Sequence, residues 1–271
     1  MNQFSLADKV VVVTGAAGLL GKNHVHAIVS AGGVPVLIDI DESGLKLVVE
    51  DFKKTYNTDL ANFVVDITDE NQVKACCENI LSKFGHIDGL VNNAANNPKI
   101  EANGFNEQSR LENFSLKNWQ ADIAVGLTGA FLCTKYFGTA IAKQGGSIVN
   151  ISSDLGLIAP DQRLYEKPGL APNNQPVKPV TYSVVKTGLI GLSRYTATYW
   201  AKQGVRCNSL CPGGVENSQD VSFVTKLTSL IPLGRMAKQN EYQGSLVFLL
   251  SDASSYMTGT ELTADGGRTA W

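Results

Sequence analysis

Residues 9–21, KVVVVTGAAGLLG, decide the fold because an apolar run is followed at once by a glycine-rich turn. A strand that is buried on both faces of a sheet requires such a continuous apolar run. Apolar residues then recur at helical spacing from Leu20 to Ile28, until two glycines end the helix. The next run, VPVLID at 34–39, is apolar again, so the start of the chain predicts one strand–helix–strand unit.

The same alternation continues to the end of the chain. We expect helices near 42–56, 69–84, 115–143 and 180–202, and strands at 61–66, 87–92, 146–152, 205–210 and 261–264. Strands that alternate with helices throughout form a parallel sheet with helices on both faces. No linker and no internal repeat interrupts the pattern. Residues 1–271 are therefore predicted to form one doubly wound α/β domain with about seven strands.

The composition argues against several classes of partner. The chain has 271 residues, of which 44% are hydrophobic and 18% charged, and its formal charge is −2. A near-neutral balance without a basic block argues against nucleic acid or an anionic membrane as the main partner. No apolar stretch reaches the roughly 18 residues that span a bilayer, and the first residues lack a secretory pattern, so we expect a cytoplasmic protein.

Five cysteines lie scattered along the chain, at positions 76, 77, 133, 207 and 211. An odd, scattered set suits a reducing compartment better than a disulfide framework. Cys207 and Cys211 bracket a short polar run, but no histidine or second cysteine pair lies near them in sequence. We therefore expect no metal site.

The glycine turn predicts an anion-binding site. Glycine directly after a buried strand lets the backbone turn sharply, and the following helix then points its free N–H groups into the turn. Gly15, Gly18 and Gly21 have this position. Tight packing of the helix against the strand is the alternative explanation.

Asp39 makes this turn a candidate nucleotide site. It ends the second strand, about twenty residues beyond the glycines, where a carboxylate accepts hydrogen bonds from the ribose diol of adenosine. The same carboxylate repels a 2′-phosphate, and neither the turn nor Ile40 supplies a positive charge. We therefore expect NAD(H) rather than NADP(H) as the cofactor.

Tyr182 and Lys186 form the candidate catalytic pair. They lie four positions apart, which places both on one face of a helix. The lysine ammonium favours the phenolate form of the tyrosine, which makes the tyrosine usable as an acid or base at a carbonyl or alcohol. Ser153 follows the fifth strand at the carboxyl edge of the sheet, where its hydroxyl can hydrogen-bond a developing oxyanion.

Residues 154–179 break the alternation with five prolines, which exclude a helix or a central strand. We expect a structured loop of this length beside Ser153 to contact the substrate. Arg163 and Tyr165 offer hydrogen bonds to hydroxyl groups, a carboxylate or a phosphate, which favours a polar, sugar-like substrate. The alternative is that Arg163 is a surface charge.

Together these residues resemble the classical short-chain dehydrogenase/reductase family over nearly the whole chain. Asn92–Ala95, Pro212-Gly213 and Asp265–Gly267 are further landmarks of the resemblance. It implies a Rossmann-like sheet, a nicotinamide cofactor, a homodimer or homotetramer, and catalysis by Ser153 with the Tyr182–Lys186 pair. With the arguments above, it implies cofactor contacts at Thr14, Gly15, Gly18, Leu20, Gly21, Asp39, Ile40, Asp66, Ile67, Asn93, Ala94, Ala95, Ile151, Tyr182, Lys186, Pro212, Gly213 and Val215.

The sequence departs from the family pattern at Gly126. In the family this position holds an asparagine that orders a proton-relay water, so the change bears on the rate and on proton delivery rather than on hydride transfer. The loop at 154–179 also looks like that of short-chain oxidoreductases encoded with bacterial surface-glycan and flagellin-modification enzymes.

The sequence thus predicts an oxidoreductase that uses NAD(H) to move a hydride to or from a secondary alcohol or ketone of a polar small molecule. Tyr182 exchanges the proton, Lys186 lowers the pKa of Tyr182 and holds the ribose, and Ser153 polarises the carbonyl. Two alternatives stay open. One is a sugar epimerase or dehydratase that keeps its NAD bound, and the other is a catalytically weak NAD(H)-binding sensor or scaffold, which Gly126 motivates.

Overall fold

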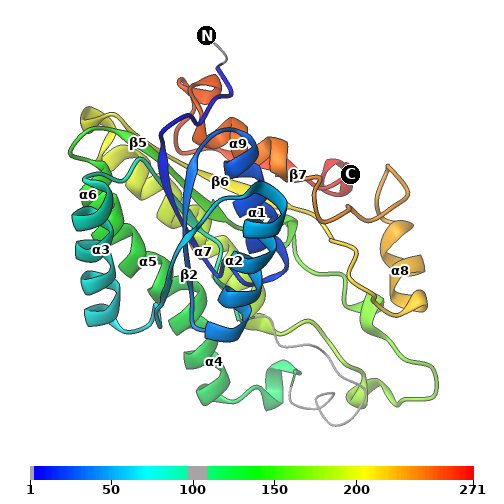
Figure 1. The fold of residues 1–271 in the computed structure, drawn as a ribbon. Helices are drawn as coiled ribbons and strands as arrows, with labels where there is room; N and C mark the ends of the chain where they lie inside the picture. Colours follow the sequence, from blue (N-terminus) through cyan, green and yellow to red (C-terminus); the bar gives the residue numbers. More distant parts are fainter. Residues whose placement is uncertain (1–2, 97–108) are drawn as a thin grey trace.

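Seven parallel strands form one sheet, in the order β3-β2-β1-β4-β5-β6-β7 (Figure 1). The computed structural model describes residues 3–96 and 109–271. The strands are β1 Val10–Thr14, β2 Val34–Asp39, β3 Ala61–Val64, β4 Gly89–Asn92, β5 Gly146–Ile151, β6 Val205–Pro212 and β7 Glu261–Ala264. Every expected strand is present, and the predicted Rossmann-like α/β fold is confirmed.

Helices cover both faces of this sheet (Figure 1). On one face a core that includes Val11 packs against α1 Leu19–Ser30, α2 Glu42–Tyr56 and α9 Gln243–Leu250. On the other face a core that includes Val12 packs against α3 Glu70–Phe84, α5 Gly129–Cys133 and α7 Val180–Tyr199. Successive side chains of a strand point to opposite faces, so the continuous apolar run of β1 serves both cores.

Side chains and left-handed residues set the helix ends. Asp41 caps α2 by accepting a hydrogen bond from the Gly44 N–H at 3.0 Å, and Asp69 caps α3 in the same way. Asn57 ends α2 at φ 52°, and Gly85 ends α3 at φ 80°. These local signals explain why both helices match their predicted ranges closely.

The helix expected near 115–143 is irregular. α4 Leu116–Ile123 leads into a π-helical turn at Ala124–Thr128, then α5, a second π-helical turn at Thr134–Gly138 and α6 Thr139–Ile141. A single wide turn does not change the apolar spacing enough to be seen in the sequence. Such turns often occur at functional sites, and the first one contains Gly126.

Two helices near the C-terminus were not predicted. α8 Val221–Thr228 and α9 have eight residues each, too few for a clear helical period. Asp220 begins α8 by accepting a hydrogen bond from the Ser222 N–H at 2.9 Å. α9 consists largely of apolar residues, so its pattern resembles a buried strand as much as a helix.

The proline-rich insertion, residues 154–179, is ordered by hydrogen bonds rather than by long elements. Its regular pieces are short 3₁₀ turns at Asp154–Gly156, Gln162–Tyr165 and Pro172–Asn174. The Gln175 amide accepts from the Lys167 N–H at 2.8 Å and donates to the Lys167 carbonyl at 3.0 Å. Lys226 of α8 donates to the main-chain carbonyls of Arg163 and Glu166 at 3.2 and 2.9 Å. The insertion is therefore a structured loop attached to α8.

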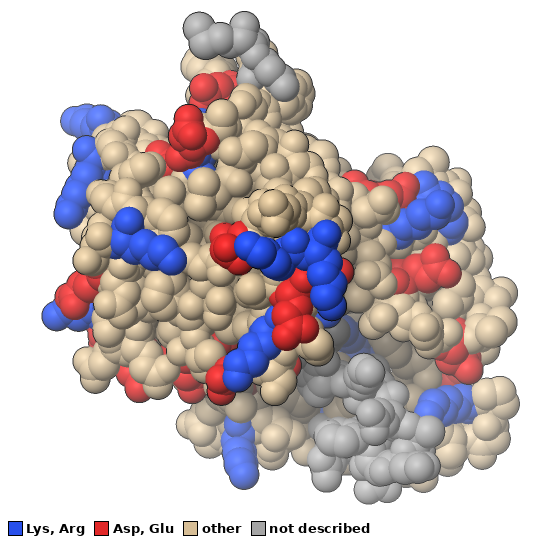
Figure 2. All heavy atoms as spheres, in the orientation of Figure 1, with Lys and Arg blue, Asp and Glu red and all other residues tan. Residues whose placement is uncertain are grey.

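Several further expectations concern the whole described chain. Across residues 3–96 and 109–271, no helix has the length and apolar character to cross a membrane. The same residues contain no cluster of three or more His, Cys, Asp or Glu side chains placed to bind a metal ion. All five cysteines are buried and have free thiols. Acidic and basic side chains are interspersed on the face that Figure 2 shows.

Candidate active site

A cleft of about 630 Å³ lies at the carboxyl ends of the central strands. The sheet runs from β1 to β2 in one direction and from β1 to β4 in the other, and open α/β sheets bind ligands at this switch point. Most predicted site residues line the cleft: Gly15, Gly18, Leu20, Asp39, Ile40, Asp66, Ile67, Asn93, Ala94, Ala95, Ile151, Ser153, Tyr165, Tyr182, Lys186, Pro212, Gly213 and Val215. Thr14, Gly21 and Arg163 lie outside this lining.

The glycine turn is folded closely against the start of α1 and leaves the end of this helix uncapped. Gly15 has φ +64°, and a Cβ on Gly21 would lie 2.0 Å from the Gly15 carbonyl oxygen. α1 follows Gly18, which has no side chain to cap the helix. The N–H groups of the first helical turn are therefore available to the phosphates of a nucleotide.

Thr14 does not line the cleft, but its hydroxyl holds the backbone of the residues that do. Its hydroxyl donates to the Val91 carbonyl at 3.3 Å and accepts from the N–H groups of Asn93 and Ala94 at 3.0 and 3.1 Å. The Asn93 amide in turn donates to the carbonyls of Thr14 and Gly15, both at 3.0 Å. These bonds join the loops after β1 and β4, so Thr14 positions the backbone of the turn.

The Asp39 side chain is fixed at one end of the cleft by two backbone N–H groups. One carboxylate oxygen accepts from the Ala17 N–H at 2.9 Å and the other from the Asp41 N–H at 3.1 Å. Asp41 and Asp66 line the same end. The cations among the lining residues are Lys178, Lys186 and Arg268, which lie around Tyr182 and Asp154 instead. The Asp39 end of the lining is therefore acidic.

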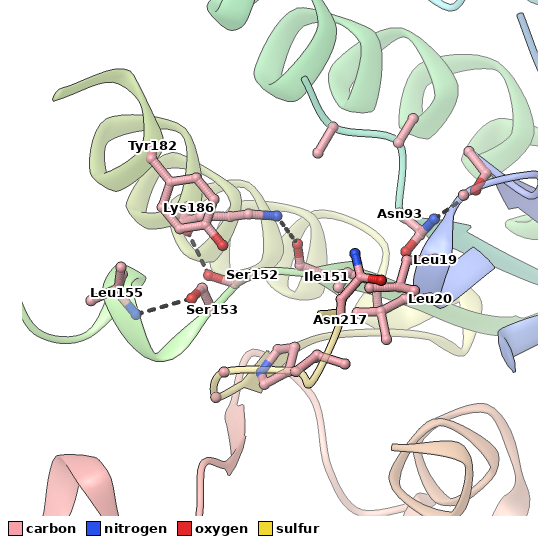
Figure 3. Close-up of a pocket in the computed structure, with 18 of the residues that line it drawn as sticks. Leu19, Leu20, Asn93, Ile151, Ser152, Ser153, Leu155, Tyr182, Lys186 and Asn217 are labelled. Atoms are coloured by element: carbon pink, nitrogen blue, oxygen red, sulfur yellow. Dashed lines mark hydrogen bonds between the residues drawn. The ribbon is translucent and has the colours of Figure 1, made fainter. Parts of the chain in front are cut away.

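Ser153 and Tyr182 meet at the other end of the cleft (Figure 3). The Ser153 hydroxyl donates to the Asp154 carboxylate at 2.7 Å and accepts from the Leu155 N–H at 3.1 Å. Burial raises the pKa of Tyr182, a hydrogen bond with Ser153 lowers it in part, and the negative charge of Asp154 raises it further. Tyr182 therefore carries its proton near pH 7.

Lys186 is a buried cation beside Tyr182, and only 5% of its surface is exposed. Its Nζ donates to the Ile151 carbonyl at 2.7 Å and lies 5.8 Å from the centre of the Tyr182 ring. The Lys186 carbonyl accepts from the Ser152 hydroxyl at 2.7 Å, which ties α7 to the end of β5 (Figure 3). Burial lowers the pKa of Lys186 to about 8, and the charge of Lys178 lowers it as well.

A buried ion pair lies beside Ser153 in the wall of the cleft. Arg268 Nη1 lies 2.7 Å from the Asp154 carboxylate, and both side chains are almost completely buried. Arg268 comes from the last turn of the chain, Arg268–Ala270. The pair balances the Asp154 charge beside Ser153 and connects the C-terminal turn to the end of β5.

The two predicted substrate contacts in the insertion have different positions. Tyr165 lines the cleft and packs against Phe223 of α8, with 5.5 Å between ring centres. Arg163 instead pairs with Asp161 through two hydrogen bonds of 2.9 and 2.7 Å, and 79% of its side chain is exposed. An aspartate two positions earlier holds the guanidinium, so the structure does not bring Arg163 into the cleft.

Sequence reasoning missed several lining residues from the insertion, from α8 and the loops on either side of it, and from the last turn. They are Asp154, Leu164, Lys178, Gln219, Phe223, Leu227, Met236 and Arg268. Most of these segments have no periodic pattern from which their place could be predicted. Lys178 is the exception, because it precedes Tyr182 by the same four positions that separate Tyr182 from Lys186.

Gly126 lies where a side chain has no room. A Cβ at this position would lie 2.5 Å from a methyl carbon of Val185, the residue before Lys186. Beside it is a cavity of about 20 Å³, which is enough for one water molecule. Asp122 and Thr181 line this cavity, and the Thr181 hydroxyl donates to the Asp122 carboxylate at 2.5 Å.

These residues fit a dinucleotide. The uncapped glycine turn would hold the pyrophosphate, Asp39 the adenosine ribose, and Lys186 the ribose next to the reacting ring. The nicotinamide, when bound, supplies or accepts a hydride. The protein itself would supply the proton chemistry, because Tyr182 holds an exchangeable proton and the Ser153 hydroxyl lies beside it.

Comparisons with protein families agree with this geometry. A family model described as short chain dehydrogenase matches residues 9–165. A second model, described as enoyl-(acyl carrier protein) reductase, matches residues 170–269. The two matches together cover nearly all of the chain.

Similar proteins include several dehydrogenases. The 2,5-dichloro-2,5-cyclohexadiene-1,4-diol dehydrogenase of Sphingobium indicum is 34% identical, and the alignment covers 98% of each chain. The NADP-dependent mannitol dehydrogenase of Hypocrea jecorina is 32% identical over 99% of this chain and 95% of its own. A crystal structure of a gluconate 5-dehydrogenase from Burkholderia cenocepacia, in complex with NADP and tartrate, matches with a TM-score of 0.86 at 25% identity over 100% of this chain and 98% of that one.

Proposed function

Because this chain belongs to the short-chain dehydrogenase/reductase family, we propose that it is an NAD(H)-dependent oxidoreductase acting on a secondary alcohol or ketone of a polar, sugar-like molecule. Family membership supports hydride transfer between a nicotinamide and an alcohol or ketone. The observation that carries the proposal is the group of Ser153, Tyr182 and Lys186 in one cleft with the glycine turn.

The proposed roles follow from the geometry. In the direction of reduction, Tyr182 gives its hydroxyl proton to the substrate oxygen while the carbonyl carbon receives the hydride. The Ser153 hydroxyl turns from the Asp154 carboxylate to donate a hydrogen bond to that oxygen, and the Lys186 ammonium, 5.8 Å from the Tyr182 ring centre, stabilises the phenolate that remains. Oxidation of the alcohol is the reverse, with Tyr182 as the base.

Asp39 supports NAD(H) as the cofactor. Its carboxylate is held by two backbone N–H groups at the acidic end of the cleft lining, where a ribose diol can donate to it and a 2′-phosphate is repelled. Two of the similar proteins have NADP in their descriptions, so the titration below compares NADH with NADPH directly.

The cleft lining supports a polar substrate with an apolar face. Asn217 offers hydrogen bonds to hydroxyl groups, whereas Tyr165 and Phe223 form an aromatic surface on which the C–H face of a sugar can pack. Mannitol and gluconate in the names of similar enzymes agree with a polyol or sugar acid.

We propose a homodimer or homotetramer that uses the outer face of α7. Tyr195 and Tyr199 stack on this helix with 5.7 Å between ring centres, and they are 65% and 62% exposed. Exposed aromatic pairs of this kind are typical of subunit interfaces.

A binding titration followed by a turnover assay tests the proposal. The purified protein is titrated with NADH and with NADPH by fluorescence, and the same sample is assayed at the nicotinamide absorbance band with polyols, sugars and sugar acids. We expect preferential NADH binding and substrate-dependent NADH formation or consumption.

Each other outcome points elsewhere. Equal or tighter NADPH binding contradicts the role of Asp39. Tightly co-purifying NAD without net NADH formation supports the epimerase or dehydratase alternative, and binding without any turnover supports the sensor alternative.

A further inference from the structure

Lys178 places a second ammonium against the proposed catalytic tyrosine. Its Nζ lies 3.8 Å from the centre of the Tyr182 ring, closer than the 5.8 Å of Lys186. Lys178 lies near the end of the proline-rich insertion, two residues before α7 begins at Val180. It lines both the main cleft and the small cavity beside Gly126, as Tyr182 and Lys186 also do.

We propose that Lys178 is a positioning residue for proton transfer. Its positive charge lies over the face of the Tyr182 ring and stabilises the phenolate of Tyr182, and the same charge repels the ammonium of Lys186. This inference rests on the proposed function of Tyr182 as the acid or base. It assigns a role in the proton chemistry to the insertion, in addition to substrate contact.

The physical basis is the difference between a phenol and a phenolate. A cation on the ring face of a neutral tyrosine gains a modest cation–π attraction. When the hydroxyl proton leaves, the same cation faces a full negative charge, so it stabilises the phenolate more than the phenol. Lys178 therefore favours the transition state in which Tyr182 loses its proton.

Other charged and titratable groups surround the two lysines and Tyr182. They are Asp154 after β5, Tyr165 in the insertion, Cys211 on β6, Arg268 in the last turn, which is bonded to Asp154, and Asp122 on α4 across the small cavity. Asp154 attracts Lys178 and also raises the pKa of Tyr182. Cys211 of β6 raises the pKa of Lys186.

The two ammonium groups also act on each other. Burial lowers the pKa of Lys178 to about 8, with Asp154 opposing the shift. Burial lowers the pKa of Lys186 to about 8, and repulsion by Lys178 contributes. Removing the charge at position 178 removes this repulsion, so Lys186 should keep its proton to a higher pH. Both lysines are charged below pH 8, which is the range in which they assist Tyr182.

Titration of Lys186 tests the inference without any substrate. Side-chain NMR of protein made with isotope-labelled lysine follows Lys186, whose signal is assigned by its absence in Lys186→Gln. We expect Lys178→Gln to raise the Lys186 midpoint by about one pH unit. Lys178→Arg, which keeps the charge, should leave the midpoint at or below the wild-type value. An unchanged midpoint in Lys178→Gln overturns the inference, whatever the enzyme turns over.

Turnover gives the second test. In the direction of reduction at pH 7, Lys178→Gln should lower kcat about tenfold, which corresponds to one pKa unit of lost phenolate stabilisation. The alkaline limb of its pH profile should move upward, the KM for NADH should stay the same, and Lys178→Arg should restore most of kcat. A loss of equal size at every pH that arginine does not restore would show a structural role only.

Lys226→Gln is the matched control. It removes the hydrogen bonds from α8 to the Arg163 and Glu166 carbonyls, and therefore loosens the insertion. It leaves the positive charges next to Tyr182 in place. It should leave the Lys186 midpoint and the shape of the pH profile unchanged. If it shifts them as Lys178→Gln does, the effect comes from the insertion as a whole and the inference is overturned. If the wild type turns over no substrate, the proposed function fails, and the Lys186 titration still decides the part of Lys178.

Discussion

At the scale of single residues, the Asp39 carboxylate is the feature on which the cofactor proposal depends. Its two oxygens already accept backbone N–H groups, which fixes their direction before any ligand arrives. Because the carboxylate is already held in place, it loses little conformational freedom when a nucleotide binds. We therefore expect Asp39 to contribute more to nucleotide affinity than a mobile side chain would.

Asp39→Asn should therefore weaken NADH binding by about tenfold or more, since a hydrogen bond to a charged group is worth roughly 1.5–3 kcal/mol. NADPH binding should weaken less or improve, because the repulsion of the 2′-phosphate is lost. Fluorescence titration measures both constants. Asp69→Asn is the control, because asparagine caps α3 as well as aspartate does and position 69 is outside the cleft lining. An unchanged NADH:NADPH ratio in Asp39→Asn would contradict the assignment.

The Asp154–Arg268 pair makes a prediction about stability. Arg268→Met leaves a buried carboxylate without its partner, which should cost about 3–5 kcal/mol of the free energy of unfolding. The double variant Asp154→Asn with Arg268→Met should recover much of that loss, because no unpaired charge remains. Denaturant unfolding measures both. A single variant as stable as the wild type would show that the pair is unimportant.

Most residues that the sequence proposed for the site line one cleft, for a physical reason. The residues after consecutive parallel strands meet at one edge of the sheet, so Gly15, Asp39, Asp66 and Ser153 share a cleft once the strand order is known. Arg163 was placed by type and proximity along the chain, and its nearer neighbour Asp161 takes its guanidinium instead. Such local competition is decided by side-chain geometry, which a sequence pattern does not contain.

At the scale of elements, the first π-helical turn and α7 fit each other through Gly126 and Val185. The small residue in one accommodates the branched residue in the other. The sequence showed only that Gly126 departs from the family pattern. The structure adds that the space of a side chain at this position is occupied.

Gly126→Asn should accordingly lower the free energy of unfolding by about 1–3 kcal/mol through overpacking. Adding Val185→Ala should restore part of the loss, because the contact of 2.5 Å between the new Cβ and a Val185 methyl is removed. Thermal and denaturant unfolding of the two single variants and the double variant give the coupling. Additive effects would mean that the two positions do not compete for space.

The elements that the sequence missed are short. α8 and α9 have eight residues each, and the insertion consists of single turns held by side-chain to backbone bonds such as those of Gln175. Long elements have a periodic pattern and cap residues at their ends, as α2 and α3 do. The walls of the substrate end come largely from the short elements, and for that reason Phe223 and Met236 could not be foreseen.

At the scale of the whole molecule, the outer face of α7 predicts self-association. Light scattering should give a mass of two or four times the 29.0 kDa of one chain. Tyr195→Glu with Tyr199→Glu should shift the mass toward one chain, because two charges would be buried in the proposed interface. Tyr256→Glu, at a completely exposed position elsewhere, is the control. A wild-type mass of one chain would contradict the proposed oligomer.

In the proposed function, the whole fold brings two parts of the site into one cleft. The carboxyl ends of β1 and β2 bind the nucleotide, and the end of β5 with α7 supplies the proton donor. The most direct test of this account is the rate of nicotinamide oxidation or reduction by Tyr182→Phe beside the wild type, on whichever polyol or sugar acid the wild type turns over. The account predicts a loss of at least about a hundredfold in kcat, with NADH binding nearly unchanged. Turnover by Tyr182→Phe at the wild-type rate would show that another group moves the proton, and would contradict the central assignment.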